Sequence, residues 1–340
     1  MNATRQLHDL GQSLWLDNIT RSLLTSGTPV RHIKDCAVSG LTSNPTIFEQ
    51  AIGKSDAYDD ALRRQAGTGE SGEALFFGLV IDDLTRAADL FRPAFDASGG
   101  VDGWVSLEVS PLLADDAAKM IAAAARLHAR ATRPNLFIKI PGTPAGITAI
   151  EESIFAGVPI NVTLLFSWAH YVAAAEAYLC GIKRRIAAAQ DPVVPSVASL
   201  FVSRWDVATH DALPVPLRNR LGIAVGARTQ RLLWASTGTK DPAAPDTLYV
   251  EALAAPDMID TIPEKTLAAF ADHGKVRPPM GLDGGDADAV IAECRSAGVD
   301  AAALATKLQR DGAAAFSKSW RELLSGIQAK SEALTQSSAP

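Results

Sequence analysis

The sequence contains few of the residues that build disulfide frameworks or metal sites. Its 340 residues include three cysteines, Cys36, Cys180 and Cys294, which lie far apart, and six histidines that form no HExxH motif. Widely spaced cysteines are typical of proteins in a reducing compartment, and zinc ligands occur at short fixed spacings. We therefore predict a cytoplasmic protein with reduced thiols and without a metal site.

The sequence also lacks the features of proteins that bind nucleic acids or enter membranes. Its 38 acidic and 32 basic residues give a formal net charge of −6, and it contains no long basic run. Duplex nucleic acid binds basic surfaces, so we exclude it as a partner. The N-terminal stretch MNATRQLHDLGQS has no signal-peptide pattern. The apolar run at 158–182 contains Asn161, Thr163 and Glu176, which favours a buried strand and a helix over a membrane span.

Short apolar strands alternate with alanine-rich amphipathic helices along almost the whole chain. The eight predicted strands cover residues 14–17, 38–42, 104–109, 136–140, 160–165, 197–201, 232–236 and 258–262. This alternation is typical of βαβ units in a parallel sheet. Without a Pro- or Gly-rich linker, it predicts an α/β fold, a single (β/α)₈ TIM barrel over residues 1–340. A doubly wound sheet is the alternative, but no G-x-G-x-x-G motif follows the first strand.

Helix signals support this interpretation in the middle of the chain. Thr143 can cap a helix that begins at Pro144, and Gly157 can end that helix. Near the C-terminus, we expect residues 275–328 to form extra helices packed on the barrel and residues 329–340 to form a polar tail. No exposed apolar stripe distinguishes one barrel helix in the sequence, which leaves the oligomeric state open.

The strand LFIKI at 136–140 contains a lysine where the pattern is otherwise apolar. Side chains of a barrel strand alternate between the interior and the helix-facing exterior, so Phe137 and Lys139 should point inward. A lysine removed from water must find a partner or lose its charge, and burial favours the neutral amine. Because a neutral amine attacks carbonyl groups, this lysine predicts Schiff-base catalysis. The alternative is a structural ion pair with Glu108.

Polar residues stand at the ends of seven predicted strands. They are Asp17, Asn44, Glu108, Lys139, the pair Asn161 and Thr163, Ser199, and Ser236. The carboxyl ends of barrel strands meet at the mouth where barrel enzymes act. For Ser199 and Ser236 a helix cap or a solvated position is the alternative, and for Asn44, which precedes Pro45, the alternative is a turn. The coincidence around Lys139 favours an active site, in which Asp17 and Glu108 are available for proton transfer.

A phosphate site is indicated by two basic residues just beyond strand ends. Arg204 follows the strand at 197–201, and Lys240 follows the strand at 232–236. Each lies beside small hydroxyl residues and a predicted helix start, which can offer backbone N–H groups to an anion. The loop after the seventh strand binds phosphate in many barrel enzymes. Taken singly, either charge is also compatible with a solvated surface position.

Eight stretches between about residue 11 and residue 274 closely resemble the transaldolase family, and its longer bacterial branch is nearest. In chain order they are QSLWLDNITRSLL, GLTSNPTIFEQAI, VSLEVSPLLADD, LFIKIPGTPAGI, PINVTLLFS, SVASLFVSRWD, LLWASTGTKDP and DTIPEKTLAAFADHG. The stretches TSNPTIFE and NVTLLFS are specific to the family, and all eight occur in family order.

The resemblance implies a mechanism that needs neither cofactor nor metal. It implies that Lys139 forms a Schiff base with C2 of a ketose phosphate. It also implies that Asp17 deprotonates the C4 hydroxyl, and that Glu108 and Thr163 hold the catalytic water. These roles remain expectations at this point, since they come from the family and not from spacing.

The resemblance also implies which residues bind the substrate. They are Asn44, Asn161, Ser199 and Phe201 for the dihydroxyacetone unit, and Arg204 and Ser236 for the phosphate. Many family members carry an arginine at the position of Gly238, so we assign its charge to Lys240. A lysine is a point charge and does not bind bidentately as arginine does.

The implied activity is reversible transfer of a dihydroxyacetone unit in the non-oxidative pentose phosphate pathway. The donor would be sedoheptulose 7-phosphate or fructose 6-phosphate, and the acceptor glyceraldehyde 3-phosphate or erythrose 4-phosphate. Sugar phosphates would be the partners of a monomer or homodimer. The nearest rival is an aldolase that releases the unit. A glycoside hydrolase using Asp17 and Glu108 would leave Lys139 without a role, and a non-catalytic barrel would not group polar strand ends.

Overall fold

The computed structural model describes residues 2–66, 72–227, 232–281 and 284–336 of the chain. Eight parallel strands form a closed barrel in chain order. They are β1 (Ser13–Asp17), β2 (Val38–Thr42), β3 (Val105–Glu108), β4 (Leu136–Pro141), β5 (Ile160–Leu165), β6 (Ser196–Phe201), β7 (Leu233–Ala235) and β8 (Ile259–Ile262). Every predicted strand is present, with bounds that differ from the prediction by at most one residue. The predicted (β/α)₈ TIM barrel is confirmed.

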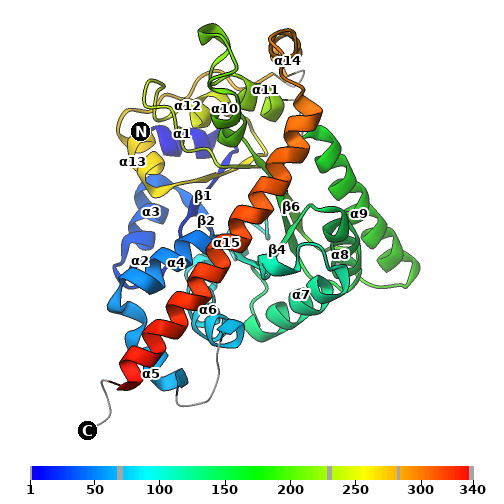
Figure 1. The fold of residues 1–340 in the computed structure, drawn as a ribbon. Coiled ribbons are helices and arrows are strands. Elements are labelled where there is room, and N and C mark those ends of the chain that lie inside the picture. Colours follow the sequence, from blue (N-terminus) through cyan, green and yellow to red (C-terminus); the bar gives the residue numbers. More distant parts are fainter. Residues whose placement is uncertain (1, 67–71, 228–231, 282–283, 337–340) are drawn as a thin grey trace.

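Helices surround the barrel, and one long helix crosses it (Figure 1). They are α1 (Ala3–Asp9), α2 (Arg21–Thr25), α3 (Thr28–Cys36), α4 (Pro45–Lys54), α5 (Asp59–Ala66), α6 (Gly72–Ala97), α7 (Ala117–Ala131), α8 (Pro144–Phe155), α9 (Trp168–Ala187), α10 (Ser203–Thr209), α11 (Leu221–Ala227), α12 (Leu248–Ala252), α13 (Glu264–His273), α14 (Ala287–Ser296) and α15 (Ala301–Gln336). Short 3-10 helices occupy Asp56–Tyr58, Pro111–Leu113 and Val215–Leu217.

The local signals around α8 act as predicted. Thr143 Oγ1 accepts a hydrogen bond from the backbone N–H of Gly146 at 3.1 Å, and Pro144 occupies the first turn. Gly157 follows the helix with a φ of 84°, a left-handed conformation that favours glycine. The cap, the first-turn proline and the terminating glycine therefore fix both ends of α8 and the start of β5.

The apolar run at 158–182 forms β5 and most of α9, as predicted. Every residue of β5 is buried in the barrel wall, and α9 packs against α8 outside it. No helix in the described part of the chain is long and apolar enough to cross a membrane. The run is apolar because a parallel strand is covered on both faces.

Aromatic rings fill the amino-terminal half of the barrel interior. Phe137 stacks on Trp104 with ring centroids 4.0 Å apart, and it lies 6.1 Å from the Trp15 ring. Gly40 makes room for this cluster, because a Cβ there would lie 2.7 Å from Trp15 Cδ1. Phe137 therefore points inward as predicted. Alternation then turns Lys139, two residues further along β4, into the interior at the opposite end.

Helix α15 crosses the carboxyl-terminal mouth of the barrel (Figure 1). Gln309 Nε2 donates hydrogen bonds to the backbone carbonyls of Gly142 at 2.8 Å and Leu164 at 3.0 Å. Eleven residues further along α15, about three helical turns, Trp320 Nε1 donates to Glu73 Oε1 on α6 at 2.9 Å. These contacts hold α15 against β4, β5 and α6, so the helix closes part of the mouth.

The predicted boundary between helix and polar tail at residue 328 differs from the structure, because α15 continues to Gln336. Lys330 Nζ lies 2.6 Å from Asp59 Oδ1, and this ion pair holds the last turns of α15 against α5. Residues 337–340 of the predicted tail lie outside the described residues. The division of the chain at residue 275 stays a prediction.

Two glycines of α15 give a matched test of how tightly this helix packs. A Cβ at Gly312 would lie 2.9 Å from Arg204 Nη1 and 3.0 Å from Leu164 Cδ2, whereas a Cβ at Gly326 would meet nothing within 4 Å. We expect Gly312→Ala to lower the free energy of unfolding by about 1–3 kcal/mol through overpacking. Gly326→Ala should raise it by up to about 1 kcal/mol through helix propensity. Urea unfolding followed by tryptophan fluorescence measures both, and equal effects would contradict the close approach.

Candidate active site

A cavity of about 340 Å³ opens at the carboxyl-terminal mouth of the barrel, and Phe316 of α15 forms part of its wall. Nine of the eleven predicted site residues line this cavity: Asp17, Asn44, Lys139, Thr163, Ser199, Phe201, Arg204, Ser236 and Lys240. They come from six strands and the segments that follow them. The polar residues that the sequence places at strand ends therefore lie together at one mouth of the barrel, as predicted.

The other two predicted residues, Glu108 and Asn161, lie beneath the cavity lining and contact it. Glu108 Oε2 is 3.5 Å from Lys139 Nζ. Asn161 Oδ1 accepts a hydrogen bond from Ser199 Oγ at 2.7 Å, and its Nδ2 donates to Ser106 Oγ at 3.1 Å. Both side chains are buried. They form a second layer of polar side chains, whose contacts orient Lys139 and Ser199 in the cavity lining.

Lys139 is held at the cavity by two contacts. Strand register places Glu108 of β3 directly opposite Lys139 of β4. The lysine Nζ also donates a hydrogen bond to the backbone carbonyl of Ser43 at 3.0 Å, and the residue is only 6% exposed. The alternative predicted from the sequence, a buried ion pair with Glu108, is thus present. It coexists with a cavity that gives the amine access to a ligand.

Asp17 lies across the same cavity and accepts hydrogen bonds from two neighbours. Thr42 Oγ1 donates to its Oδ1 at 2.9 Å, and Asn44 Nδ2 donates to its Oδ2 at 3.3 Å. Burial raises the pKa of Asp17, while the charge of Lys139 and these two hydrogen bonds oppose the rise. A carboxylate with a raised pKa is a stronger base than an ordinary aspartate, which suits it to accept a proton.

Glu108 and Thr163 each have a buried oxygen without a hydrogen-bond partner. Burial raises the pKa of Glu108, and the nearby charge of Lys139 opposes the rise. Glu108 Oε2 and Thr163 Oγ1 form no hydrogen bond with any described residue. Apart from the ion pair of Glu108 Oε2 with Lys139, these two oxygens are free to accept or donate hydrogen bonds to a polar ligand.

Arg204 is packed between two aromatic rings at the other side of the cavity. Its Cζ lies 4.9 Å from the Phe201 ring centroid and 5.5 Å from the Phe316 ring centroid. Burial lowers the pKa of Arg204, and the charge of Glu108 opposes this shift. No described carboxylate forms an ion pair with the guanidinium. A fixed guanidinium without a carboxylate partner is available to bind an anion.

Ser236 and Lys240 complete this basic side. Ser236 has a φ of 61°, a left-handed conformation that is rare for serine, and its hydroxyl lies 2.8 Å from Ser203 Oγ. Such strain is typical of functional sites, where surrounding contacts maintain it. A Cβ at Gly238 would lie 3.8 Å from Lys240 Nζ, so the lysine amine reaches the space beside position 238.

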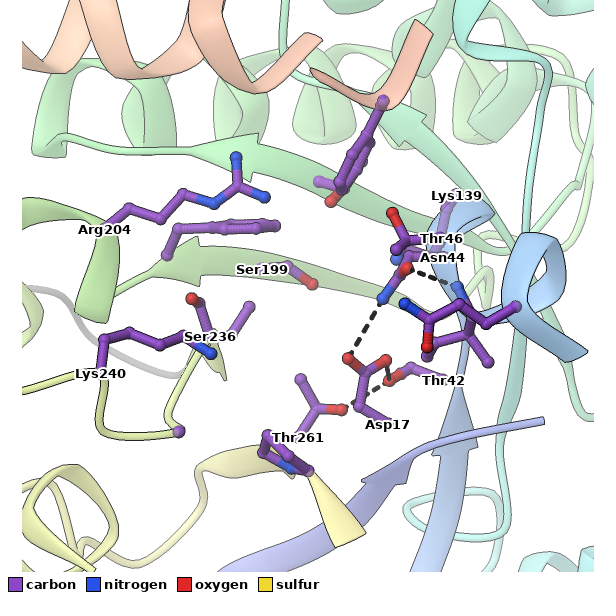
Figure 2. Close-up of a pocket in the computed structure, with 18 residues that line it drawn as sticks. Asp17, Thr42, Asn44, Thr46, Lys139, Ser199, Arg204, Ser236, Lys240 and Thr261 are labelled. Atoms are coloured by element: carbon purple, nitrogen blue, oxygen red, sulfur yellow. Dashed lines mark hydrogen bonds between the residues drawn. The ribbon is translucent and has the colours of Figure 1, made fainter. Parts of the chain in front are cut away.

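The cavity therefore has two ends of different chemistry. Figure 2 shows Lys139, Asn44 and Asp17 on one side and Arg204, Ser236 and Lys240 on the other. This arrangement suits an elongated ligand with a carbonyl group at one end and an anionic group at the other. In the described part of the chain, no group of three or more His, Cys, Asp or Glu side chains could hold a metal ion.

Of the three residues with a structural alternative, one caps a helix. Asn44 caps α4 by accepting a hydrogen bond from the N–H of Ile47, and its Nδ2 still donates to Asp17. Ser199 and Ser236 cap no helix, because their hydroxyls contact Asn161 and Ser203 instead. The capping half of the alternative is therefore wrong for both serines, and Asn44 caps a helix where a turn was the alternative.

Sequence reasoning missed several residues of the cavity, which are Thr42, Thr46, Gln50, Thr261 and Phe316. Thr261 is the penultimate residue of β8, so the search for polar residues at strand ends would have found it if applied to the eighth strand. Thr42 is the last residue of β2, which is the same kind of signal. Phe316 lies on α15, and no local pattern connects it with the strands.

Comparison with known proteins agrees with this geometry. The family model Transaldolase/Fructose-6-phosphate aldolase matches residues 14–327. A transaldolase of Thiobacillus denitrificans is 41% identical over 96% of this chain and 100% of its own length. Transaldolase 1 of Streptomyces coelicolor is 41% identical over 96% of this chain and 94% of its own. A transaldolase of Neisseria gonorrhoeae is 39% identical over 94% of this chain and 97% of its own. The chain therefore belongs to the transaldolase/fructose-6-phosphate aldolase family.

Proposed function

We propose that this protein is a transaldolase that carries a dihydroxyacetone unit from a ketose phosphate to an aldose phosphate on Lys139. One observation carries the proposal: a buried lysine amine reaches a cavity and lies within electrostatic range of two carboxyl groups, the half-buried Asp17 and the buried Glu108. Relatives named transaldolase that match almost the whole chain support the same reaction. The enzyme is a transferase of the pentose phosphate pathway.

The first step is attack of the neutral Lys139 amine on C2 of the ketose. The N–C bond forms, and the former carbonyl oxygen takes up protons and leaves as water, which gives the Schiff base. Glu108 is 3.5 Å from the amine, and its raised pKa suits it to donate and accept these protons. The unpartnered oxygens of Glu108 and Thr163 support a role for this pair in holding the water.

Asp17 serves as the base that breaks the carbon–carbon bond. It takes the proton of the C4 hydroxyl, the C3–C4 bond breaks, and its electron pair moves toward the Schiff-base nitrogen. The aldose leaves, and the three-carbon unit stays on Lys139 as an enamine. The enamine then attacks the carbonyl carbon of the acceptor, and hydrolysis frees the new ketose. The raised pKa of Asp17 supports this role.

The remaining residues bind the two ends of the substrate. The hydroxyls of the dihydroxyacetone unit would meet Asn44, Asn161, Ser199 and Phe201. The hydrogen bond between Asn161 and Ser199 supports this, because it fixes both side chains before the sugar arrives. The phosphate would meet Arg204, Ser236 and Lys240, which lie across the cavity from Lys139 (Figure 2).

Transfer is favoured over simple aldol release. The family includes fructose-6-phosphate aldolases, but the relatives above carry the name transaldolase. The cytoplasmic location stays part of the proposal, and the three free thiols support it.

Borohydride reduction in the presence of fructose 6-phosphate tests the Schiff base directly. We expect a three-carbon adduct on Lys139, because cleavage releases the aldose and leaves dihydroxyacetone on the amine. Peptide mass spectrometry identifies the modified lysine. Lys139→Ala should give no adduct and no transfer, while Lys240→Ala, a second lysine of the same cavity, should still be labelled. A label on any other lysine would exclude the mechanism.

Asp17→Asn separates Schiff-base formation from cleavage in the same assay. The variant keeps Lys139 and should form the adduct, but it lacks the base for the C4 hydroxyl. We therefore expect reduction to trap the intact six-carbon sugar phosphate. A three-carbon adduct formed at the parent rate would assign the base to another residue.

The pH dependence of kcat/KM tests Asp17 as the base. Activity should fall as pH decreases through the pKa of Asp17, because the protonated acid cannot accept the C4 proton. The hydrogen bond from Thr42 lowers that pKa, so Thr42→Val should raise it and move the acidic limb to higher pH. Thr46→Val is the control, since Thr46 lines the cavity but bonds to Ser319. An unchanged limb in Thr42→Val would argue against Asp17.

Substrate binding tests the phosphate residues. Arg204→Ala should raise KM for fructose 6-phosphate by roughly 10–100-fold and Lys240→Ala by about tenfold, with little change in kcat. A contact to a non-reacting phosphate stabilises ground and transition states alike. The control substrate is glyceraldehyde, an acceptor without phosphate, whose KM should not change. If Lys240→Ala binds as tightly as the parent, the assignment of the missing arginine's charge to Lys240 is wrong.

A further inference from the structure

Strand β5 contains an irregularity next to the cavity. Its register with β6 shifts between Val162 and Leu165. Within this interval Thr163 and Leu164 both lie opposite Ser199, which is the arrangement of a β-bulge. Leu164 has a φ of 59°, a left-handed conformation that is rare for a bulky residue and persists only where surrounding contacts maintain it. The bulge therefore requires support from outside the strand.

The bulge determines which side chains β5 directs into the cavity. Thr163 lines the cavity, whereas Leu165 is fully buried and does not line it. In a regular strand these two residues would point to the same side of the sheet. The extra residue between them breaks this alternation, as bulges next to active sites often do. The orientation of Thr163 thus depends on the conformation of Leu164.

A glutamine of helix α15 holds the backbone at this bulge. Gln309 is buried, and its Nε2 donates hydrogen bonds to the carbonyls of Gly142 at 2.8 Å and Leu164 at 3.0 Å. The backbone N–H of Gly142 in turn donates to the carbonyl of Thr163 at 2.8 Å. These three hydrogen bonds join α15 to the carboxyl ends of β4 and β5, the strands that carry Lys139 and Thr163.

The surroundings of Gln309 fix the orientation of its amide. The backbone N–H of Phe166 donates to His170 Nδ1 at 3.3 Å, so this ring nitrogen is an acceptor. It lies 3.4 Å from Gln309 Nε2, beside the two carbonyl oxygens. An amide oxygen at this position would face three acceptors, whereas the NH₂ group offers two donors. The contacts of Gln309 with Gly142 and Leu164 therefore require a donor.

We propose that Gln309 is a positioning residue, which maintains the left-handed conformation of Leu164 and thereby directs the Thr163 hydroxyl toward the catalytic water. This inference rests on the proposed function, in which Glu108 and Thr163 hold that water. Thr163 Oγ1 forms no hydrogen bond with a described residue, so the backbone sets its position. Gln309 supplies this constraint from 145 residues away in the chain.

Gln309 acts through the strand and not through the substrate, because it does not line the cavity. Its removal should slow the two steps in which water takes part, which are release of water as the Schiff base forms and addition of water as it is hydrolysed. Both steps need the Thr163 hydroxyl in place, and a displacement of about 1 Å can cost about a hundredfold in rate. The phosphate end should bind as before, since Arg204 and Ser236 follow β6 and β7.

Gln309→Met tests the inference, because methionine keeps the length of the side chain and removes the donor. We expect kcat for transfer from fructose 6-phosphate to erythrose 4-phosphate to fall by about 10–100-fold. The inhibition constant of inorganic phosphate, which competes for Arg204, should not change. Gln328→Met is the matched control and should keep the parent kcat, since Gln328 lies on the exposed side of α15 and bonds to Glu332.

Two results of this experiment would overturn the inference. One is an unchanged kcat in Gln309→Met. The other is a phosphate inhibition constant that changes by the same factor as kcat. Phe316 of α15 packs on Arg204, so that result would show a general displacement of the helix instead of a local effect at Thr163.

A double-mutant cycle tests whether Gln309 acts through Thr163. Thr163→Val removes the hydroxyl and keeps the shape of the side chain. If Gln309 serves to place that hydroxyl, Gln309→Met should lower kcat by less than about twofold in the Thr163→Val background. Effects of the two substitutions that multiply in the double variant would reject a role through Thr163.

Failure of this inference can be distinguished from failure of the proposed function. Borohydride labelling of Lys139 and transfer by the parent test the proposed function alone. A labelled and active parent, with a Gln309→Met variant of equal kcat, would reject only the role of Gln309. A parent that is neither labelled nor active would reject both.

Discussion

The buried contact between Lys139 and Glu108 is the constraint on which the site depends. Strand register sets the two residues opposite each other, with Nζ and Oε2 3.5 Å apart in a setting from which water is largely excluded. Removing one partner of such a pair typically costs about 3–5 kcal/mol, because the other charge stays buried. The amine is nevertheless not enclosed, since it also reaches the cavity. The protein thus maintains a polar group at a position where an apolar residue would be more stable, which is typical of a group kept for chemistry.

The cost of burying these polar groups is limited because the barrel interior is divided into an apolar half and a polar half. Trp15, Trp104 and Phe137 fill the amino-terminal half and carry the packing energy. The carboxyl-terminal half can then hold Lys139, two carboxyl groups and their hydrogen-bond donors without weakening the core. Because the strands are parallel, all their carboxyl ends lie at the same mouth. One or two polar residues at the end of each strand are therefore enough to form the site.

The regular alternation of side chains along parallel strands explains how much of the fold and site could be predicted from the sequence. Period-two alternation and helix caps gave all eight strands within one residue at each end, and the same alternation directed Lys139, Asn161 and Thr163 inward. Site residues that lie outside the strands could not be predicted from strand alternation. Phe316 is more than a hundred residues from Arg204 in the chain, and only the tertiary path of α15 brings its ring to the guanidinium.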